Sequence, residues 1–406
     1  MPHYNITLDK DYMQGLMKND SAMKKLFEDT LNKIMEEQHN EHVSAAPFER
    51  TENRKAQQNG YWKRSLITRI DTLNLRVPGT RDGTFSTDLF DRYQRSEQAF
   101  VLTLIEMVIN GVSTRKVTRV VEELCGAEIS RSMVSNLCRR LDPVVKGWNQ
   151  RPLGTYPFLI VDALVIKVRK EGRVRQESVL LAIGINSDGY REILGFHVGD
   201  SESASSWEEF FRILKDRGLN GVDLVVSDDH RGLVRAVYKH FQGASWQRCQ
   251  AHFIRNIVNA CPKARKEEMK LRLRMIFDAP DMATARHLLA EMLEIYGEKA
   301  SRAMECLEEG FEDAMAVMAL PVRYRKRLRT TNGIERLNEE IRRRERVIRI
   351  FPNDASAVRL LGALLMETDE NWSTGHRYFD MAEYWGGRWR EEQENDSNLT
   401  KIEKVA

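Results

Sequence analysis

The sequence predicts an α/β protein whose core is a mixed five-stranded sheet, with helical segments before the sheet and an all-α insertion after its last strand. Five strand-like runs fall within residues 155–261, in the order β-β-β-α-β-α-β-α. The second and third runs flank the turn sequence NSDGY, which favours an antiparallel hairpin. The later runs alternate with amphipathic helices, which favours parallel pairing. Residues 262–325 carry helical periodicity and no strand signal, which indicates the insertion.

The composition excludes several classes of protein. The chain has 406 residues, enough for two or three domains at about 150 residues each. Hydrophobic residues make up 42% and charged residues 30%, which rules out collagen-like, low-complexity and disulfide-scaffold proteins. No apolar run approaches the roughly 18 residues of a membrane span, and we find no secretory leader. Five cysteines without framework spacing fit a reducing compartment, so we expect a cytoplasmic protein.

Three segments are predicted before the sheet. Residues 1–45 carry helical periodicity. Residues 46–95 read as a polar linker with an extended or hairpin arm, because the run YWKRSLITRIDTLNLRVPGT alternates and ends near Pro-Gly. The basic side chains of this arm would allow contacts with phosphates. Residues 96–150 form three short helices that resemble a helix-turn-helix, although a packing unit without a role in DNA binding explains the same pattern.

The third of these helices is unusually polar, which makes it the candidate for contact with DNA. Its predicted DNA-facing residues are Arg131, Ser135, Asn136, Arg139 and Arg140. At the other end of the chain, residues 326–380 form the final helices of the core, and residues 381–406 form a charged tail.

Asp162 is the first residue that needs a chemical explanation. It stands inside the apolar run LIVDALVI, where strand periodicity puts it on the same face as Ile160 and Leu164. Burying a carboxylate is costly unless it has a partner. Either a metal ion or an arginine from elsewhere in the chain would remove that cost.

Two further acids occur at positions where chemistry is expected. Asp228 ends the apolar strand VDLVVS, and ligands of α/β sheets gather at the carboxyl ends of strands. Capping of the next helix is the simpler reading, and Asp229 could serve as that cap equally well. Glu335 lies in the helix NGIERLNEEIRRR, where a salt bridge with a nearby arginine such as Arg342 is the simpler reading.

Taken together, the three acids indicate a metal site. Carboxylates from two strand ends and one helix can hold two Mg²⁺ ions about 3.5–4 Å apart and promote phosphodiester chemistry. Between residues 321 and 349 the chain has eleven Arg or Lys and four Glu, although its overall charge is only +3. We therefore expect a polyanionic substrate beside this stretch.

Several separate motifs now resemble one family. The segments FLIVDALVIKVR, LGFHVGDSESASSWEEFFRILKDRGL, VVSDDHRGL, CQAHFIRN and TTNGIERLNEEIRRR occur in the order found in bacterial Mutator-type insertion-sequence transposases. The segment from Asn59 to Phe85 also resembles that family, and the similarity covers roughly residues 50 to 380. The resemblance implies an RNase H-like core with an Asp-Asp-Glu triad, which maps onto Asp162, Asp228 and Glu335. The family usually has glycine at the position of Asp229, which leaves this residue as a rival ligand.

The resemblance also implies a Cys-x-x-His pair near the active site, here Cys249 and His252. A zinc site with Cys261 and His240 as further ligands is an alternative, but structural zinc needs four ligands at compact spacing, so a packing or DNA-contacting role is favoured. Trp207 is expected in the core rather than as an exposed stacking residue.

We therefore predict a DNA transposase that binds terminal inverted repeats. It would cleave DNA by Mg²⁺-dependent hydrolysis, with Mn²⁺ as a substitute, and join the 3′-hydroxyl by strand transfer, through a circular intermediate that the resemblance implies. Expected partners are double-stranded element ends and target DNA, with at least a homodimer on DNA, in the cytoplasm at the nucleoid. Predicted phosphate contacts are Arg323, Arg325, Lys326, Arg327, Arg329, Arg336, Arg342, Arg343 and Arg346. An RNase H-like nuclease without strand transfer, or a domesticated DNA-binding protein, are the alternatives.

Overall fold

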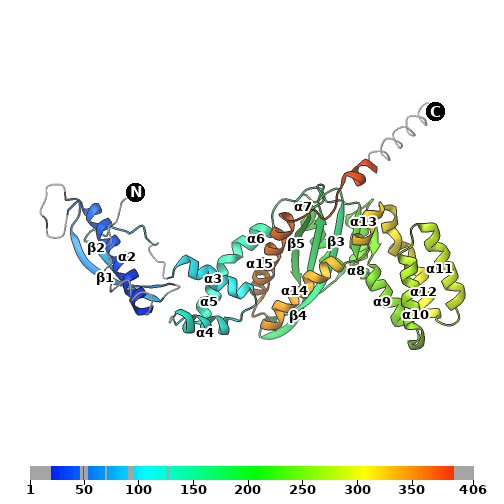
Figure 1. Cartoon of the computed structure of the whole chain (residues 1–406), viewed down its shortest axis with the longest axis horizontal. Helices are drawn as coiled ribbons and strands as arrows, with labels where there is room; N and C mark the ends of the chain where they lie inside the picture. The colour runs from blue at the N-terminus through cyan, green and yellow to red at the C-terminus, as the bar shows by residue number, and fades with distance from the viewer. Residues whose placement is uncertain are drawn as a thin grey trace, which may run out of the picture. The chain divides into compact units, whose positions relative to one another are not determined.

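The structure is a computed structural model that describes residues 20–45, 49, 54–68, 71–89, 96–125 and 128–387 (Figure 1). The chain divides into two compact units, Met1–Arg140 and Leu141–Ala406. The periodicity expected before residue 20 and most of the charged tail lie outside the described residues. None of the described helices combines the length and the apolar composition that a bilayer crossing needs.

The first unit begins with a helix packed on a two-stranded antiparallel sheet. Helix α2 spans Asp20–Val43, and the strands are β1 (Gln58–Ile67) and β2 (Thr72–Thr80). The hairpin therefore forms where the alternating sequence predicts extended chain. The buried apolar residues of the hairpin form a small cluster with Met35 of α2: Leu66, Leu73, Leu75 and Val77.

Three helices complete the first unit: α3 (Gln98–Ile109), α4 (Thr114–Cys125) and α5 (Arg131–Cys138). The Ser130 side chain caps α5 by accepting a hydrogen bond from the main-chain N–H of Met133 at 3.1 Å. The predicted DNA-facing residues on and after α5 are all exposed: Arg131, Ser135, Asn136, Arg139 and Arg140.

The third short helix ends well before residue 150, the end of the predicted helical segment. A 3₁₀ turn, Arg139–Leu141, separates α5 from α6 (Asp142–Asn149). Pro143 explains the break, because a residue without an N–H fits only the first turn of a helix. The boundary between the two units falls at the same place.

A mixed five-stranded sheet lies at the centre of the second unit, as predicted. Its strands are β3 (Phe158–Lys170), β4 (Arg173–Ile185), β5 (Arg191–Gly199), β6 (Leu224–Ser227) and β7 (Ser245–Arg248). The spatial order is β5-β4-β3-β6-β7. The first three strands pair antiparallel, whereas β6 and β7 are parallel to β3. The hairpin and βαβ signals in the sequence account for this mixture.

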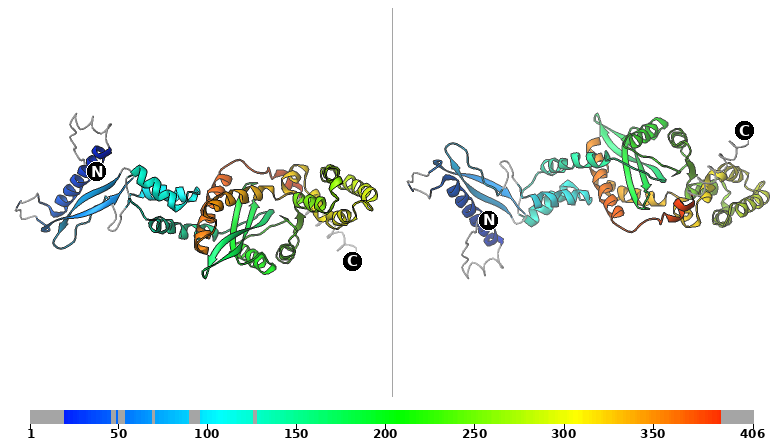
Figure 2. Two further views of the ribbon diagram at one scale, coloured as in Figure 1. Left: turned by 90° about the horizontal axis from the view of Figure 1, so that it is seen from below. Right: turned by 90° about the horizontal axis from the view of Figure 1, so that it is seen from above.

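Helices cover both faces of the sheet (Figure 2). Helices α14 (Asn332–Ile348) and α15 (Asp354–Ser373) share one buried cluster with the sheet. Helices α7 (Ala204–Asp216) and α8 (Arg231–His240) share another. Alternate residues of β3 enter the two clusters, and the even-numbered ones, such as Ile160 and Leu164, face α14. Asp162 has the same parity, so it faces α14 as well.

An all-α region follows β7 and begins before residue 262, where the predicted insertion starts. Its helices are α9 (Gln250–Ala260), α10 (Lys266–Phe277), α11 (Met282–Tyr296) and α12 (Ser301–Met315), and they have a buried core of their own. Gln247 of β7 joins this insertion to the sheet. Its amide nitrogen donates to the carbonyl of Ala314 at 2.7 Å, and its amide oxygen accepts from the N–H of Val317 at 2.6 Å. Helix α13 (Val322–Leu328) then leads back to α14.

Candidate active site

Asp162 is held by hydrogen bonds in a partly buried, acidic environment. One carboxylate oxygen accepts from the side chain of Asn338 at 2.8 Å, and the other accepts from the main-chain N–H of Ala163 at 2.9 Å. Burial raises the pKa of Asp162 to about 7, and the nearby charges of Asp228 and Glu202 act in the same direction. Removing the carboxylate from water disfavours its charged form, and like charges add to that cost.

Asp228 and Asp229 leave the end of β6 in different directions. Parallel pairing of β3 with β6 aligns Ile160 with Val226. Asp162 lies two residues after Ile160, and Asp228 lies two residues after Val226. Asp228 is partly buried and acts on the charge of Asp162. Asp229 is exposed and pairs with Arg248, with 2.9 Å between its oxygen and the guanidinium nitrogen. The N-cap position of α8 belongs to His230, without a side-chain cap, so neither acid has the capping role that the sequence suggested.

Glu335 lies in the first turn of α14, where it meets a histidine from α9. Its Oε1 lies 3.4 Å from His252 Nε2. Within the described chain this oxygen is shielded from solvent and accepts no hydrogen bond. Asn338, three residues later on the same helix, reaches Asp162. Helix α14 thus brings both Glu335 and the amide that orients Asp162 to the edge of the sheet.

Cys249 connects the start of α9 to the start of α14. The Thr331 N–H donates to Cys249 Sγ at 3.3 Å, and the Thr331 hydroxyl lies 3.2 Å from the same sulfur. The hydrogen bond with Cys249 raises the pKa of His252, and the charge of Glu335 raises it further. The Cys-x-x-His pair therefore lies next to Glu335, and the contacts of Cys249 with Thr331 position the start of α14.

Glu202 is a carboxyl group of this site that the sequence did not reveal. Its Oε1 accepts from the indole N–H of Trp207 at 3.3 Å and lies 3.5 Å from His230 Nδ1. Burial raises the pKa of Glu202, and the charge of Asp228 contributes. In the sequence Glu202 only precedes a helix among serines, and no local pattern distinguishes it. Trp207 itself is fully buried, as expected for a core residue.

The donor groups suit a hard divalent cation. Asp162, Asp228 and Glu335 offer carboxylate oxygens, and the shielded, unbonded oxygen of Glu335 has unused capacity to accept. Among the described residues, no three Asp, Glu, His or Cys side chains stand close enough together to hold a metal ion as they are arranged. The Cys249 thiol is directed at Thr331, and Cys261 lies in the core of the insertion.

Four of the predicted phosphate-binding arginines already have partners within the chain. Arg323 pairs with Asp380 and Glu383, Arg325 donates to the carbonyls of Leu320 and Pro280, Arg329 pairs with Asp278, and Arg343 pairs with Glu340. Five others are exposed and form no ion pair with a described residue, although Arg327 donates a hydrogen bond to the Tyr378 carbonyl: Lys326, Arg327, Arg336, Arg342 and Arg346. The exposed group is the more available to a polyanion, because its members need not break an internal ion pair.

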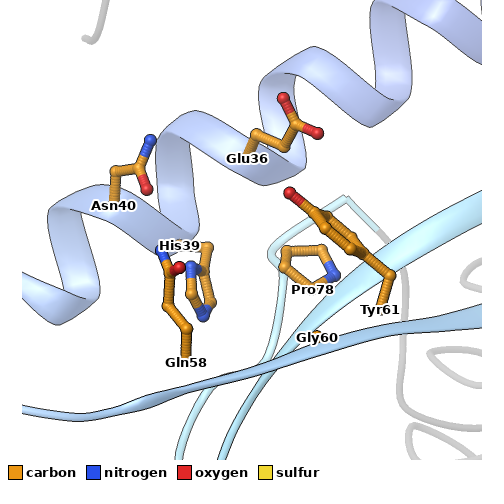
Figure 3. Close-up of a pocket in the computed structure, with 7 residues that line it drawn as sticks. All are labelled: Glu36, His39, Asn40, Gln58, Gly60, Tyr61 and Pro78. Atoms are coloured by element: carbon orange, nitrogen blue, oxygen red, sulfur yellow. The ribbon is translucent and has the colours of Figure 1, made fainter. Parts of the chain in front are cut away.

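A small pocket of about 50 Å³ lies between α2 and the hairpin in the first unit (Figure 3). Glu36 and His39 line it from the helix, and Tyr61 and Pro78 line it from the strands. Burial and the adjacent Glu36 raise the pKa of Tyr61. The guanidinium of Arg76 lies 4.7 Å from the centre of the Tyr61 ring. The hairpin therefore carries basic and aromatic side chains together, and contact of this arm with DNA stays a prediction.

Comparison with known proteins settles the family. Residues 4–375 match the family model described as "Transposase, Mutator family". The chain belongs to the Mutator family of transposases. It is thus a transposase of the insertion-sequence type, and the resemblance noted in the sequence is confirmed.

Several transposases are similar to it over most of their length. The transposase of IS256 in transposon Tn4001 from Staphylococcus aureus is 45% identical over 386 residues, which is 93% of this chain and 99% of the relative. The ISRM5 transposase of Rhizobium meliloti is 44% identical, covering 90% and 92% of the two chains. The IS1081 transposase of Mycobacterium tuberculosis is 40% identical, covering 82% and 81%. A solved structure, the Mos1 strand transfer complex, matches 54% of this transposase and 81% of that chain, with 11% identity and a TM-score of 0.16, too low to bear on the fold.

The raised pKa of Asp162 predicts a pH-dependent effect of Asp162→Asn on the stability of this transposase. An ordinary aspartate ionises near pH 4, so between about pH 4 and 7 the unfolded chain has lost a proton that folded Asp162 retains. Stability of the wild type therefore falls as pH rises through this window, and asparagine lacks the effect. Without divalent cations, the stability gained by Asp162→Asn should grow by up to about 3 kcal/mol from pH 5 to pH 8, at 1.36 kcal/mol per pKa unit.

Urea unfolding of the two proteins at both pH values measures this difference. Asp188→Asn serves as the control, since it makes the same substitution at an exposed aspartate and removes no buried carboxyl. A constant difference between Asp162→Asn and wild type would contradict the assignment of a high pKa to this buried carboxyl.

Proposed function

We propose that this transposase cuts and joins DNA through Asp162, Asp228 and Glu335, with Mg²⁺ as the divalent cofactor and Mn²⁺ as a substitute. The observation that supports the proposal is that the elements bearing the three acids adjoin at the edge of the sheet where β6 ends. Asp162 and Asp228 follow aligned positions of neighbouring parallel strands, and the charge of Asp228 acts on Asp162. Helix α14 contributes Glu335 and the amide of Asn338 to the same edge.

The three carboxylates would hold the cations. Bound divalent cations supply a Lewis acid for the phosphate oxygens and a water or 3′-hydroxyl nucleophile that is active at neutral pH. Asn338 and the N–H of Ala163 fix the orientation of the Asp162 carboxylate. The raised pKa of His252 favours a proton on its ring beside Glu335 Oε1. Two successive displacements at phosphorus need no covalent bond between protein and DNA, so no serine or tyrosine nucleophile is required.

The substrates would be the terminal inverted repeats of the element and a target duplex. Cleavage at an element end would leave a 3′-hydroxyl, and strand transfer would join it to DNA, through a circular intermediate. The exposed residues of α5 are the candidates for recognition of the ends, and the exposed basic residues between 321 and 349 would contact phosphates. Joining two ends requires at least two copies of the protein on the DNA, at the nucleoid.

A joining assay tests the reaction class. The DNA that flanks the coding sequence supplies a labelled terminal repeat, either intact or with a pre-formed 3′-hydroxyl. With Mg²⁺ we expect nicking of the intact end and joining of the pre-formed end to a target duplex. A scrambled repeat and a sample with EDTA are the controls. Cleavage without joined product would favour the nuclease, and tight binding without either product would favour a DNA-binding protein that has lost catalysis.

A further inference from the structure

Two arginines from distant parts of the second unit lie against two aromatic rings, and a third lies nearby. Arg191 is the first residue of β5, and its guanidinium carbon lies 3.5 Å from the centre of the Trp372 ring and 5.0 Å from that of Tyr378. Arg327 of α13 lies 4.8 Å from the centre of the same Tyr378 ring. It also donates a hydrogen bond to the Tyr378 carbonyl. Rings at this distance hold a guanidinium plane in a defined orientation.

The cluster adjoins the helix that carries Glu335. A Cβ atom added to Gly333 of α14 would lie 3.5 Å from Arg191 Nη1, so Arg191 packs on the first turn of that helix. Arg336, on the next turn, lies close enough to act on the charge of Arg191. The guanidinium groups of Arg191, Arg327 and Arg336 are thus neighbours at the start of α14.

No described carboxylate neutralises these charges. Burial lowers the pKa of Arg191, and the charges of Arg327 and Arg336 lower it further. Arg191 Nε is shielded from solvent and, among the described residues, has no hydrogen-bond partner. Like charges and an unpaired buried donor both cost free energy, and an anion would remove both costs.

We propose that Arg191, Arg327 and Arg336 form a clamp for a single backbone phosphate of element-end DNA, next to the phosphate that reacts at the acidic site. The proposal rests on the proposed function only in taking DNA as the ligand. A planar guanidinium binds phosphate oxygens through paired N–H groups, which is the geometry that an aromatic stack preserves. Arg327 and Arg336 are exposed, so a long polymer can reach them. The clamp would position the DNA relative to Glu335.

The salt dependence of DNA binding tests the clamp. Full-length protein is titrated with a labelled terminal-repeat duplex at several salt concentrations, without divalent cations, as wild type and as the triple variant Arg191→Gln, Arg327→Gln, Arg336→Gln. Each neutralised phosphate contributes about 0.9 to the slope of log affinity against log salt. If the three arginines share one phosphate, the slope for the triple variant should differ from the wild-type slope by about one. Ethylation of that phosphate should weaken binding by wild type and leave the triple variant unaffected.

A second triple variant controls for net charge. Arg175, Arg212 and Arg286 are exposed and already paired with Glu171, Asp216 and Glu312. Replacing these three by Gln removes the same formal charge and should leave the slope unchanged. Arg191 also packs on Trp372, so the triple substitution removes a packing contact. If the triple variant does not fold, the single variant Arg336→Gln replaces it in the test. Arg336→Gln should weaken DNA binding severalfold, and ethylation of the phosphate should weaken its binding less than it weakens that of the wild type.

Two results would overturn the clamp: a slope that does not change in the triple variant, or a change approaching three units, which would indicate three independent contacts. Failure of the clamp is distinguishable from failure of the proposed function. Loss of the joining reaction with an intact change in slope would count against the catalytic proposal alone. An unchanged slope with normal joining would count against the clamp alone.

Discussion

Asp228→Asn should abolish DNA cleavage, whereas Asp229→Asn should leave it within a few-fold of the wild-type rate. The two acids are adjacent in sequence, but the charge of Asp228 acts on Asp162 and Asp229 is held by Arg248. Charge stabilisation by a metal site contributes several kcal/mol to the transition state, so we expect a loss of about a thousandfold or more for Asp228→Asn. Single-turnover cleavage of a labelled terminal repeat in Mg²⁺ measures both rates.

The other two acids extend the same comparison. Asp162→Asn and Glu335→Gln should lose cleavage to a similar degree, while all three variants retain affinity for the DNA, because the predicted binding surface is basic. Asparagine and glutamine keep the shape of each side chain, so loss of activity in a variant that remains folded at the assay pH isolates the charge. An inactive Asp229→Asn beside an active Asp228→Asn would show that the second metal ligand has been misassigned.

Asp369→Ala should destabilise the second unit by about 3–5 kcal/mol, the range for removal of one partner from a buried ionic network. Asp369 lies on α15 and is buried. One of its oxygens accepts from the N–H of Ile193 at 2.7 Å. The other accepts from the indole of Trp148 at 2.9 Å and from Arg151 at 3.0 Å. The substitution would remove the acceptor of three donors: the N–H of Ile193 in β5, the indole of Trp148 in α6 and the guanidinium of Arg151.

Urea unfolding gives the loss directly, and Asp216→Ala is the matched control. Asp216 is exposed and its only described ion pair, with Arg212, has 3.8 Å between charged atoms, so its removal should change stability by less than about 1 kcal/mol. A loss below about 1 kcal/mol for Asp369→Ala would mean that solvent replaces the lost acceptor. Such a result would show that Asp369 does not anchor α15 to the sheet.

The sheet explains why the candidate site forms where it does. Parallel pairing of β3 with β6 aligns the residues that precede Asp162 and Asp228, so the two acids occupy equivalent positions on neighbouring strands. Helix α14 packs on the same face that Asp162 occupies. The link between Cys249 and Thr331 sets where that helix begins, one turn before Glu335. Residues far apart in the chain therefore converge through strand register and one helix start.

The sequence by itself determined the strands, their mixed pairing, the all-α insertion and the anomaly of Asp162, because these depend on periodicity and turn residues within a few positions. Only the tertiary structure paired Asp229 with Arg248, brought Glu202 to the acidic site, and assigned internal partners to Arg323, Arg325, Arg329 and Arg343. It also gathered Arg191 with Arg327 and Arg336. The physical reason is that the direction and the partner of a charged side chain depend on elements that pack from distant parts of the chain, which no local pattern records.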